Sequence, residues 1–280
     1  MEILQTVAEL RGWSREKRID GKTIGLVPTM GALHAGHASL IRTAASECGS
    51  VAVSIFVNPT QFGPSEDFER YPRSFDADCV LAEAAGATVI FAPAVEELYP
   101  VGAATFVEVA GLSGRLDGLS RPGHFRGVAT VVAKLLIAAE ADRAFFGQKD
   151  AAQVAVLRRM VADLRLPAEV VVCPIVREVD GLALSSRNVY LSAGERRQAL
   201  VLSRVVWLVE AMAAGGERGT GVLIDAARLA FASEPGVRVE YIELVDWATL
   251  EPVETAAPGS LFAVAARVGA TRLIDNTVIG

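Results

Sequence analysis

The chain has 280 residues, of which 51% are hydrophobic and 21% are charged, and its formal net charge is −6. A chain of this length and apolar content can bury the core of one large domain or of two smaller ones. Since the chain is acidic and has no long Lys/Arg run, it lacks the basic patch of a nucleic-acid binder, and we expect no nucleic-acid partner.

The N-terminus and the apolar runs indicate a cytoplasmic protein without a membrane partner. Residues Met1–Leu10 include acidic side chains and no apolar signal-peptide core. The longest apolar stretch, Val128–Ala139, is interrupted by Lys134 and is too short to span a bilayer. The three cysteines are far apart and form no C-x-x-C pair, so we expect small buried residues in a reducing compartment.

Strand and helix patterns alternate along the first two thirds of the chain. Short apolar, β-branched runs predict buried strands, and apolar residues at helical spacing predict helices between them. In chain order we predict a strand over Thr23–Val27, a helix over Gly36–Cys48, a strand over Val51–Val57, a helix over Phe75–Ala85, a strand over Thr88–Phe91, a helix over Gly127–Glu140, a strand over Arg143–Phe146, a helix over Asp150–Leu164 with Asp150 as its N-cap, and a strand over Glu169–Cys173. This alternation is typical of an α/β protein whose parallel sheet is covered on both faces.

The pattern changes after Val176. We predict one long helix over Ala193–Ala213, a glycine-rich break, a helix over Val222–Ser233, strands over Arg238–Val245, Leu261–Ala266 and Thr271–Ile274, and a hairpin turn at Gly269-Ala270. Helices followed by antiparallel strands indicate a smaller, separate α+β unit. We therefore expect two domains, residues 1–176 and residues 177–280.

Three polar loops follow predicted strands of the first domain. They cover Pro28–His37, Asn58–Gly63 and Gly147–Asp150. In parallel sheets ligands bind beyond the carboxyl ends of the strands, at the point where the strand order reverses. We therefore expect all three loops to open onto one ligand site.

His34 and His37 lie in a glycine-containing turn before a predicted helix. One interpretation makes them phosphate ligands, because the free N–H groups and the dipole of a helix N-terminus favour an anion. A second makes them metal ligands together with His124, and a third makes them structural. The glycines favour phosphate, although the turn is neither a Walker A loop nor a G-x-G-x-x-G motif, and no H-E-x-x-H pattern is present.

Two further segments carry groups suited to phosphates. Lys149 follows a predicted strand, where it either neutralises a phosphate or belongs to a solvated turn, and Asp150 either caps the helix or holds a ribose hydroxyl. Ser185, Ser186 and Arg187 offer two hydroxyls and a guanidinium, which suit a triphosphate, although such a string is also common on protein surfaces.

The loop after the second predicted strand carries amides. Asn58 and Gln61 can orient a polar small molecule, or Asn58 can simply start an Asn-Pro turn. Residues 64–73 are polar and proline-bounded, and we interpret them as a cover over the site. Asp76 and Asp78 follow; they are interpreted either as magnesium ligands or as a solvated helix face.

Taken together, four segments resemble one family, the pantoate–β-alanine ligases (pantothenate synthetases). They are Pro28–His37, which is similar to the HIGH motif of class I aminoacyl-tRNA synthetases, Ser54–Phe62 with Glu66-Asp67 and Tyr71-Pro72-Arg73 after it, Phe145–Asp150, and Asp180–Asn188. The resemblance implies a Rossmann-like, HIGH-type nucleotidyltransferase domain, a smaller C-terminal α+β domain and a homodimer. It also implies ATP-dependent condensation of (R)-pantoate with β-alanine through pantoyl adenylate, assisted by Mg²⁺, with release of AMP and pyrophosphate.

The resemblance assigns roles to single residues. Catalysis falls to His34, His37, Lys149, Ser185, Ser186 and Arg187, with His37 as the catalytic histidine of the motif. ATP binding falls to Met30, Gly31, Ala32, Leu33, His34, Ala35, Gly36, His37, Gly147, Gln148, Lys149, Asp150, Val176, Leu184, Ser185, Ser186 and Arg187. Substrate binding falls to Asn58, Gln61 and Gln153, the two glutamines holding pantoate and Gln61 also lying near β-alanine. The magnesium ligands stay unassigned.

The chain departs from the family pattern in places. Ala35 stands where an acidic residue is common, Gln148 where Glu is usual, and Leu184 where Met is usual. Ala151-Ala152 stands where an aromatic residue and Gln are usual, which weakens the expected wall of the pantoate site. Three alternatives stay open beside the ligase: a nucleotidyltransferase that makes a dinucleotide, a non-catalytic nucleotide-binding regulator, and a histidine-ligated zinc hydrolase.

Overall fold

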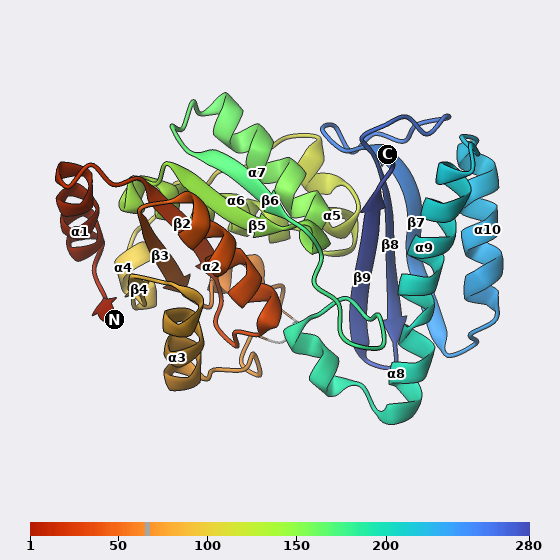
Figure 1. Cartoon of the computed structure of the whole chain (residues 1–280), viewed down its shortest axis with the longest axis horizontal. Coiled ribbons are helices and arrows are strands. Elements are labelled where there is room, and N and C mark those ends of the chain that lie inside the picture. Colours follow the sequence, from red (N-terminus) through yellow and green to blue (C-terminus); the bar gives the residue numbers. More distant parts are fainter. Residues whose placement is uncertain (65–67) are drawn as a thin grey trace.

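The computed structural model describes residues 1–64 and 68–280, and its larger sheet is entirely parallel (Figure 1). The strands are β1 (Glu2–Leu4), β2 (Ile24–Thr29), β3 (Ser50–Ile55), β4 (Val89–Phe91), β5 (Arg143–Gly147) and β6 (Glu169–Cys173), in the spatial order β1-β4-β3-β2-β5-β6. From β2 the chain adds strands on one side, and then it returns to add β5 on the other side. The order therefore reverses between β2 and β5, where a ligand crevice is expected.

Helices cover both faces of this sheet. They are α1 (Val7–Ile19), α2 (Ala35–Glu47), α3 (Phe75–Ala85), α4 (Val95–Leu98), α5 (Asp117–Ser120), α6 (His124–Ala139) and α7 (Ala151–Asp163). Successive strand residues point to opposite faces. Leu26 packs into the core with α1, α6 and α7, whereas its neighbour Val27 packs with α2 and α3. Burial on both faces explains why the strands are continuous apolar runs.

The smaller sheet is antiparallel and has the order β7-β8-β9. Its strands are β7 (Val237–Asp246), β8 (Ser260–Val268) and β9 (Thr271–Val278), and its helices are α8 (Ala193–Ala199), α9 (Val201–Ala214) and α10 (Thr220–Ala232). The two-residue turn at Gly269-Ala270 is confirmed, because Val268 pairs with Thr271 and Gly269 has a φ of 57°. Such a φ favours glycine.

Four short 3₁₀ turns complete the elements described: η1 (Pro59–Gln61), η2 (Leu112–Gly114), η3 (Gln148–Asp150) and η4 (Ser186–Tyr190). Edge strand β9 contacts η3 and η4, so the smaller sheet touches loops of the larger one (Figure 1). Within residues 1–64 and 68–280, no helix has both the length and the apolar character to cross a membrane.

Most predicted elements are present, with three differences. The single helix predicted over residues 193–213 is wrong, because the chain forms α8 and α9 with a break at Leu200. Strand β1, helix α1 and the four-residue helices α4 and α5 were not predicted. Asp150 occupies the N-cap position of α7, but its carboxylate makes no capping hydrogen bond. The domain boundary near residue 176 stays a prediction.

Candidate active site

Two adjoining cavities open at the carboxyl ends of the parallel strands. The first, of about 230 Å³, lies beyond β2, β3 and β5, and we call it the sheet cavity. The second, of about 600 Å³, lies between the larger sheet and β9, and we call it the intersheet cavity. Seven residues line both: Arg121, His124, Lys149, Asp150, Gln153, Ser185 and Arg187. The three polar loops therefore open onto one site, as predicted.

His34 and His37 cap helix α2 with their own side chains. His34 is the N-cap residue, and its Nδ1 accepts a hydrogen bond from Gly36 N at 3.1 Å. Nδ1 of His37 accepts from His34 N at 3.3 Å, which completes a capping box with histidines in place of the usual Ser/Thr and Glu. Because both Nδ1 atoms are acceptors, a neutral ring carries its proton on Nε2. Both residues line the sheet cavity, so each offers one N–H donor to a ligand.

The two imidazoles are neutral near pH 7. Burial, followed by the charge of Lys149, lowers the pKa of His34 from its ordinary value of 6.5 to about 4. Burial, followed by the neighbouring His34 and then Lys149, lowers the pKa of His37 to about 3. The ring planes are tilted by 34° with 4.1 Å between their centroids, and two neutral rings tolerate this proximity better than two cations.

Asp78 holds the loop between β2 and α2 in place. Its buried carboxylate accepts hydrogen bonds from Ala32 N at 2.9 Å, Leu33 N at 2.8 Å and Ser74 Oγ at 3.0 Å. Gly31 has a φ of 83°, which brings the following N–H groups onto Asp78. The interpretation of Asp78 as part of a solvated helix face is therefore wrong. Both carboxylate oxygens of Asp78 already accept hydrogen bonds from the loop. Asp76, in contrast, is exposed.

A network of amides fixes Gln61. Buried Asn58 donates from Nδ2 to Gln61 Oε1 at 3.0 Å and to Gly127 O at 3.1 Å. Gln61 donates from Nε2 to the Met30 sulfur at 3.0 Å. The backbone carbonyl oxygen of Gln61 lies 2.8 Å from His124 Nδ1. Asn58 thus supports Gln61 from behind, and a substrate contact of its own stays a prediction.

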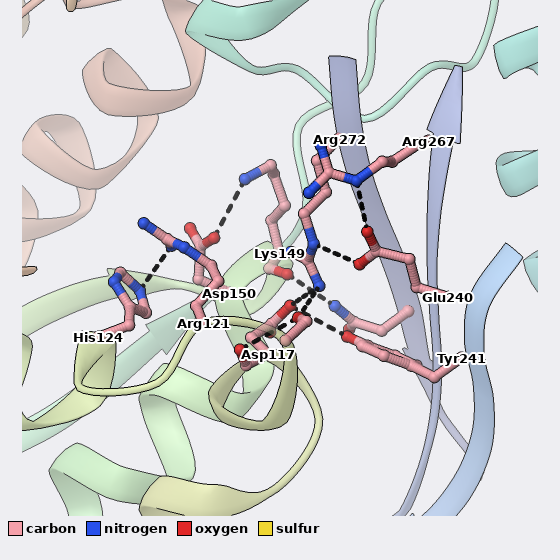
Figure 2. A network of polar contacts seen from close by, with 11 residues as sticks. Asp117, Arg121, His124, Lys149, Asp150, Glu240, Tyr241, Arg267 and Arg272 are labelled. Atoms are coloured by element: carbon pink, nitrogen blue, oxygen red, sulfur yellow. Dashed lines mark hydrogen bonds and ion pairs between the residues drawn. The ribbon is translucent and has the colours of Figure 1, made fainter. Parts of the chain in front are cut away.

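His124 is bonded at both ring nitrogens. Nδ1 lies 2.8 Å from Gln61 O. Nε2 lies 2.8 Å from Arg121 Nη1, a contact that is drawn in Figure 2. The carbonyl accepts from Nδ1–H and the guanidinium donates to Nε2, so the ring fits the neutral Nδ1–H form. The proposed metal set of His34, His37 and His124 would need to break these bonds.

Lys149 and Asp150 stand on turn η3, directly after β5. Lys149 Nζ lies 3.1 Å from Asp150 Oδ1, as Figure 2 shows, and both side chains line both cavities. Burial tends to raise the pKa of the Asp150 carboxyl, but Lys149 and then Arg187 outweigh it and hold the pKa below its ordinary value. The shared wall therefore combines cations with one ionised carboxylate.

Ion pairs just upstream hold the segment that carries Ser185, Ser186 and Arg187. Ser185 Oγ accepts from Arg187 N at 3.3 Å and starts turn η4. Upstream, Glu178 and Asp180 both pair with Arg196 of α8, at 2.7 and 2.8 Å. These pairs hold the segment against the smaller unit, with all three predicted phosphate ligands on the wall of the sheet cavity.

One side of the sheet cavity is apolar. Helix α6 contributes Val128, Val131, Val132 and Leu135, and β5 contributes Phe146. The amide side chains of Gln61 and Gln153 line the same cavity. Such a wall suits a ligand that has both alkyl and hydroxyl groups.

Part of the predicted cover lies beside the cavities. Tyr71 lines the sheet cavity, Arg70 lines the intersheet cavity, and Phe62 makes edge contacts with the rings of Phe68 and Tyr71 at 5.3 and 6.0 Å. The Glu66-Asp67 motif lies outside the described residues. Closure of residues 64–73 stays a prediction.

Most predicted site residues line the sheet cavity. They are Met30, His34, Gly36, His37, Asn58, Gln61, Gly147, Lys149, Asp150, Gln153, Val176, Leu184, Ser185, Ser186 and Arg187. Five others, Gly31, Ala32, Leu33, Ala35 and Gln148, do not belong to its wall. The departures Ala151 and Ala152 lie in the core around α7 and do not line the sheet cavity. Their effect on pantoate binding stays a prediction.

Sequence reasoning missed Arg121, Asp275 and Asn276, and it missed the supporting role of Asp78. Only Arg121, as a cation close to His124, had a signal in the sequence. No three His, Cys, Asp or Glu side chains of residues 1–64 and 68–280 converge as a metal site.

A polar network beside the intersheet cavity joins helix α5 to the smaller sheet (Figure 2). The Arg272 guanidinium lies 2.7 Å from Asp117 Oδ1 and 2.7 Å from Glu240 Oε2. Glu240 also pairs with Arg267 at 2.7 Å, and Tyr241 donates to Asp117 at 3.3 Å. Asp117 belongs to α5 and the other four residues to the smaller sheet, so the network bridges two parts of the chain.

Comparison with known proteins gives one consistent likeness. Residues 2–278 match the family described as pantoate-beta-alanine ligase. Pantothenate synthetases from Acidobacterium capsulatum and Thermotoga neapolitana are 60% and 53% identical, over 100% of this chain and 97% and 100% of their own lengths. The pantothenate synthetase of Thermus thermophilus superposes with a TM-score of 0.93 at 46% identity, covering 99% of both chains. The pantoate-beta-alanine ligase of Francisella tularensis, solved with "Beta-gamma ATP and Beta-alanine", gives 0.81 at 32% identity, covering 99% of this chain and 97% of its own.

Proposed function

The chain belongs to the pantoate-beta-alanine ligase family and is a ligase that forms pantothenate, and from this premise we propose a two-step route. A carboxylate oxygen of (R)-pantoate attacks the α-phosphorus of ATP, and the bond to pyrophosphate breaks to leave pantoyl adenylate. The amine of β-alanine then attacks the acyl carbon. The C–N bond forms and the nitrogen loses a proton. The bond between the acyl carbon and the bridging oxygen breaks, and AMP leaves with that oxygen.

One observation carries this proposal: the donor-bearing loops and the apolar wall with its amides face a single cavity. Adenylation needs a carboxylate placed beside an α-phosphate, so the two sites have to adjoin. The likeness to the Francisella tularensis ligase, solved with an ATP compound and β-alanine, supports the choice of these two substrates.

The loops supply the electrostatic part of the first step. Attack on phosphorus places extra negative charge on the phosphate oxygens, and fixed donors stabilise that charge. His34 and His37 offer neutral Nε2–H groups, and the cationic side chains of Lys149 and Arg187 line the same cavity. Ser185 and Ser186 add hydroxyl donors. These are the residues that we propose to act on the ATP phosphates.

The opposite wall suits pantoate. Its two methyl groups would pack on the α6 side chains, and its hydroxyls would bond the amides of Gln61 and Gln153. Asn58 keeps the Gln61 amide in one orientation, since it holds Gln61 Oε1 at 3.0 Å. A fixed amide can position the carboxylate of pantoate for attack.

The donor set fits Mg²⁺ bound together with ATP. Mg²⁺ usually binds through one or two carboxylates, several waters and the phosphates of the substrate. Asp150 lies beside Lys149 on the wall that both cavities share, and its carboxylate would hold the ion. When bound, Mg²⁺ would neutralise charge on the leaving pyrophosphate. We also propose that the enzyme is a homodimer, as the resemblance implies, and that it is cytoplasmic.

The test is isotope exchange between ATP and pyrophosphate by the full chain. We expect exchange only when pantoate is present, because pyrophosphate release requires the adenylate. Addition of β-alanine should then produce AMP and pantothenate in equal amounts. Exchange that does not depend on pantoate, or formation of a dinucleotide, would contradict the proposal.

A further inference from the structure

We propose that Asp275 and Asn276, adjacent residues of β9, are positioning residues that fix the two phosphate-facing loops of the site relative to each other. The inference rests on the function proposed above, since it concerns the loops proposed to bind ATP. One loop carries Lys149 on η3, and the other carries Ser185–Arg187 at the start of η4.

Asn276 holds the first loop by its backbone. Its buried carboxamide donates from Nδ2 to Gln148 O at 3.0 Å and to Lys149 O at 2.9 Å. Its Oδ1 accepts from Gln148 Nε2 at 3.2 Å. Two consecutive carbonyls bound to one amide fix the orientation of the turn, and this sets the direction in which the Lys149 side chain leaves it.

Asp275 holds the second loop through Arg177. The two oxygens of its buried carboxylate accept from Arg177 Nη1 at 2.7 Å and Nη2 at 3.0 Å, a bidentate pair. Arg177 also donates to Gly181 O at 3.1 Å, and it pairs with Ala183 across a small antiparallel bridge. This bridge leads directly into Leu184 and the phosphate-facing residues after it.

Both loops are thus bound to adjacent residues of the same strand, β9. Neighbouring residues of a strand point to opposite faces and have a fixed Cα separation. β9 is itself held by β8, in the register Val264 to Asp275 and Ala263 to Asn276. Apolar residues of similar volume would pack β9 without the desolvation of a carboxylate and an amide. The polar pair instead makes directional bonds to the two loops, which positioning requires.

The test is a double-mutant cycle on pantoate-dependent exchange in the full chain. Asn276→Leu should raise KM for ATP about tenfold and lower kcat about tenfold, with KM for pantoate changed less than about twofold, because it misdirects Lys149. In a Lys149→Ala background the same change should alter the rate by less than about twofold, since the group it positions is gone. Asp275→Asn should behave in the same way toward an Arg187→Ala background.

Thr277→Val is the matched control, because Thr277 is the next residue of β9, is buried, and lines neither cavity. It should leave both KM values unchanged within about twofold. Equal effects of Asn276→Leu in the wild-type and Lys149→Ala backgrounds, or equal changes in both KM values, would overturn the inference. If Asn276→Leu does not fold, the same cycle with the isosteric Asn276→Asp carries the test. A wild-type chain without exchange would instead overturn the proposed function.

Discussion

At the scale of single residues, the tautomers of His34 and His37 decide what the site can offer a phosphate. Both rings use Nδ1 to bond the backbone at the start of α2, so both keep Nε2–H for a ligand. A cation would attract phosphate more strongly, but the low pKa values keep these rings neutral near pH 7. In the proposed route their contribution is therefore directional hydrogen bonding, and Lys149 and Arg187 would provide the charge.

His37→Ala should lower kcat for pantoate-dependent exchange about 100-fold, because one fixed donor to the reacting phosphate is lost. His37→Gln should recover part of this loss, since the glutamine amide places an N–H group near the position of Nε2. Exchange rates measured at saturating ATP check both expectations. Wild-type exchange by His37→Ala would contradict the role.

The low pKa values also make stability depend on pH. Below pH 6.5 the unfolded chain protonates these histidines, whereas the folded chain keeps them neutral down to about pH 4 for His34 and about pH 3 for His37. The unfolded state then binds more protons, so the free energy of unfolding falls as the pH falls, by about 1 kcal/mol per pH unit for each histidine. Urea unfolding at pH 7 and pH 5 measures this loss. In His37→Gln the loss should be smaller by about 1–2 kcal/mol, and an identical loss in both chains would refute the assignment.

The site residues that lie on strand-to-helix loops could be predicted from the sequence, because Lys149 and the two histidines follow recognisable strands. The residues that support them could not. Asp78 bonds a loop 45 and 46 residues away in the chain, and Asp275 and Asn276 occur as ordinary polar residues in a strand. Their importance comes from tertiary contacts, which no local pattern encodes.

At the scale of elements, the close approach of α6 to η1 shapes the side of the cavity that we propose to bind pantoate. Gly127 of α6 lies against this turn so closely that an added Cβ would stand 2.3 Å from Thr60 O and 2.6 Å from Gln61 N. The same glycine offers its carbonyl to Asn58. A glycine inside a helix is usually unfavourable, and here contact with the turn requires it.

Gly127→Ala should therefore lower the free energy of unfolding by about 1–3 kcal/mol through overpacking, although alanine is the better helix former. Urea unfolding checks this. Gly12→Ala in α1 is the control, because nothing lies within 4 Å of its added Cβ, and it should stabilise the chain by about 0.5–1 kcal/mol. A stabilised Gly127→Ala would show that α6 and η1 are not in close contact.

Some elements were predicted with their full bounds. Helix α3 and strand β6 have the predicted bounds, and Gly86 ends α3 in the left-handed conformation. Strand β1 is only three residues long, which is too short for a pattern. Helix α1 is amphipathic, but half of its residues are charged or polar, and its stretch was interpreted only as charged. The break between α8 and α9 falls at Leu200, where no proline or glycine marks it.

At the scale of the whole molecule, the Arg272 network ties the smaller sheet to α5. Its charges are mostly buried, since the Arg272 and Asp117 side chains are 15% and 10% exposed. Removing one partner from a buried pair leaves the other charge poorly solvated, which costs far more than breaking an exposed pair. The network therefore resists separation of the smaller sheet from α5.

Arg272→Met should lower the free energy of unfolding by about 3–5 kcal/mol. The double variant Asp117→Leu with Arg272→Met should recover part of this loss, because it removes one of the charges left without its partner. Urea unfolding measures both. Arg228→Met, which breaks an exposed pair on α10, should change stability by less than about 1 kcal/mol. A loss for Arg272→Met as small as this control would show that the network contributes little.

In the proposed adenylate route, groups positioned by both sheets serve one reaction. The fate of a carboxylate oxygen tests this route most directly. The full chain is supplied with ATP, β-alanine and (R)-pantoate labelled with ¹⁸O in its carboxylate, and the products are analysed by mass spectrometry. Attack on the α-phosphorus followed by loss of AMP predicts one ¹⁸O in each AMP and none in pyrophosphate. AMP without label, or label in released phosphate, would contradict the route.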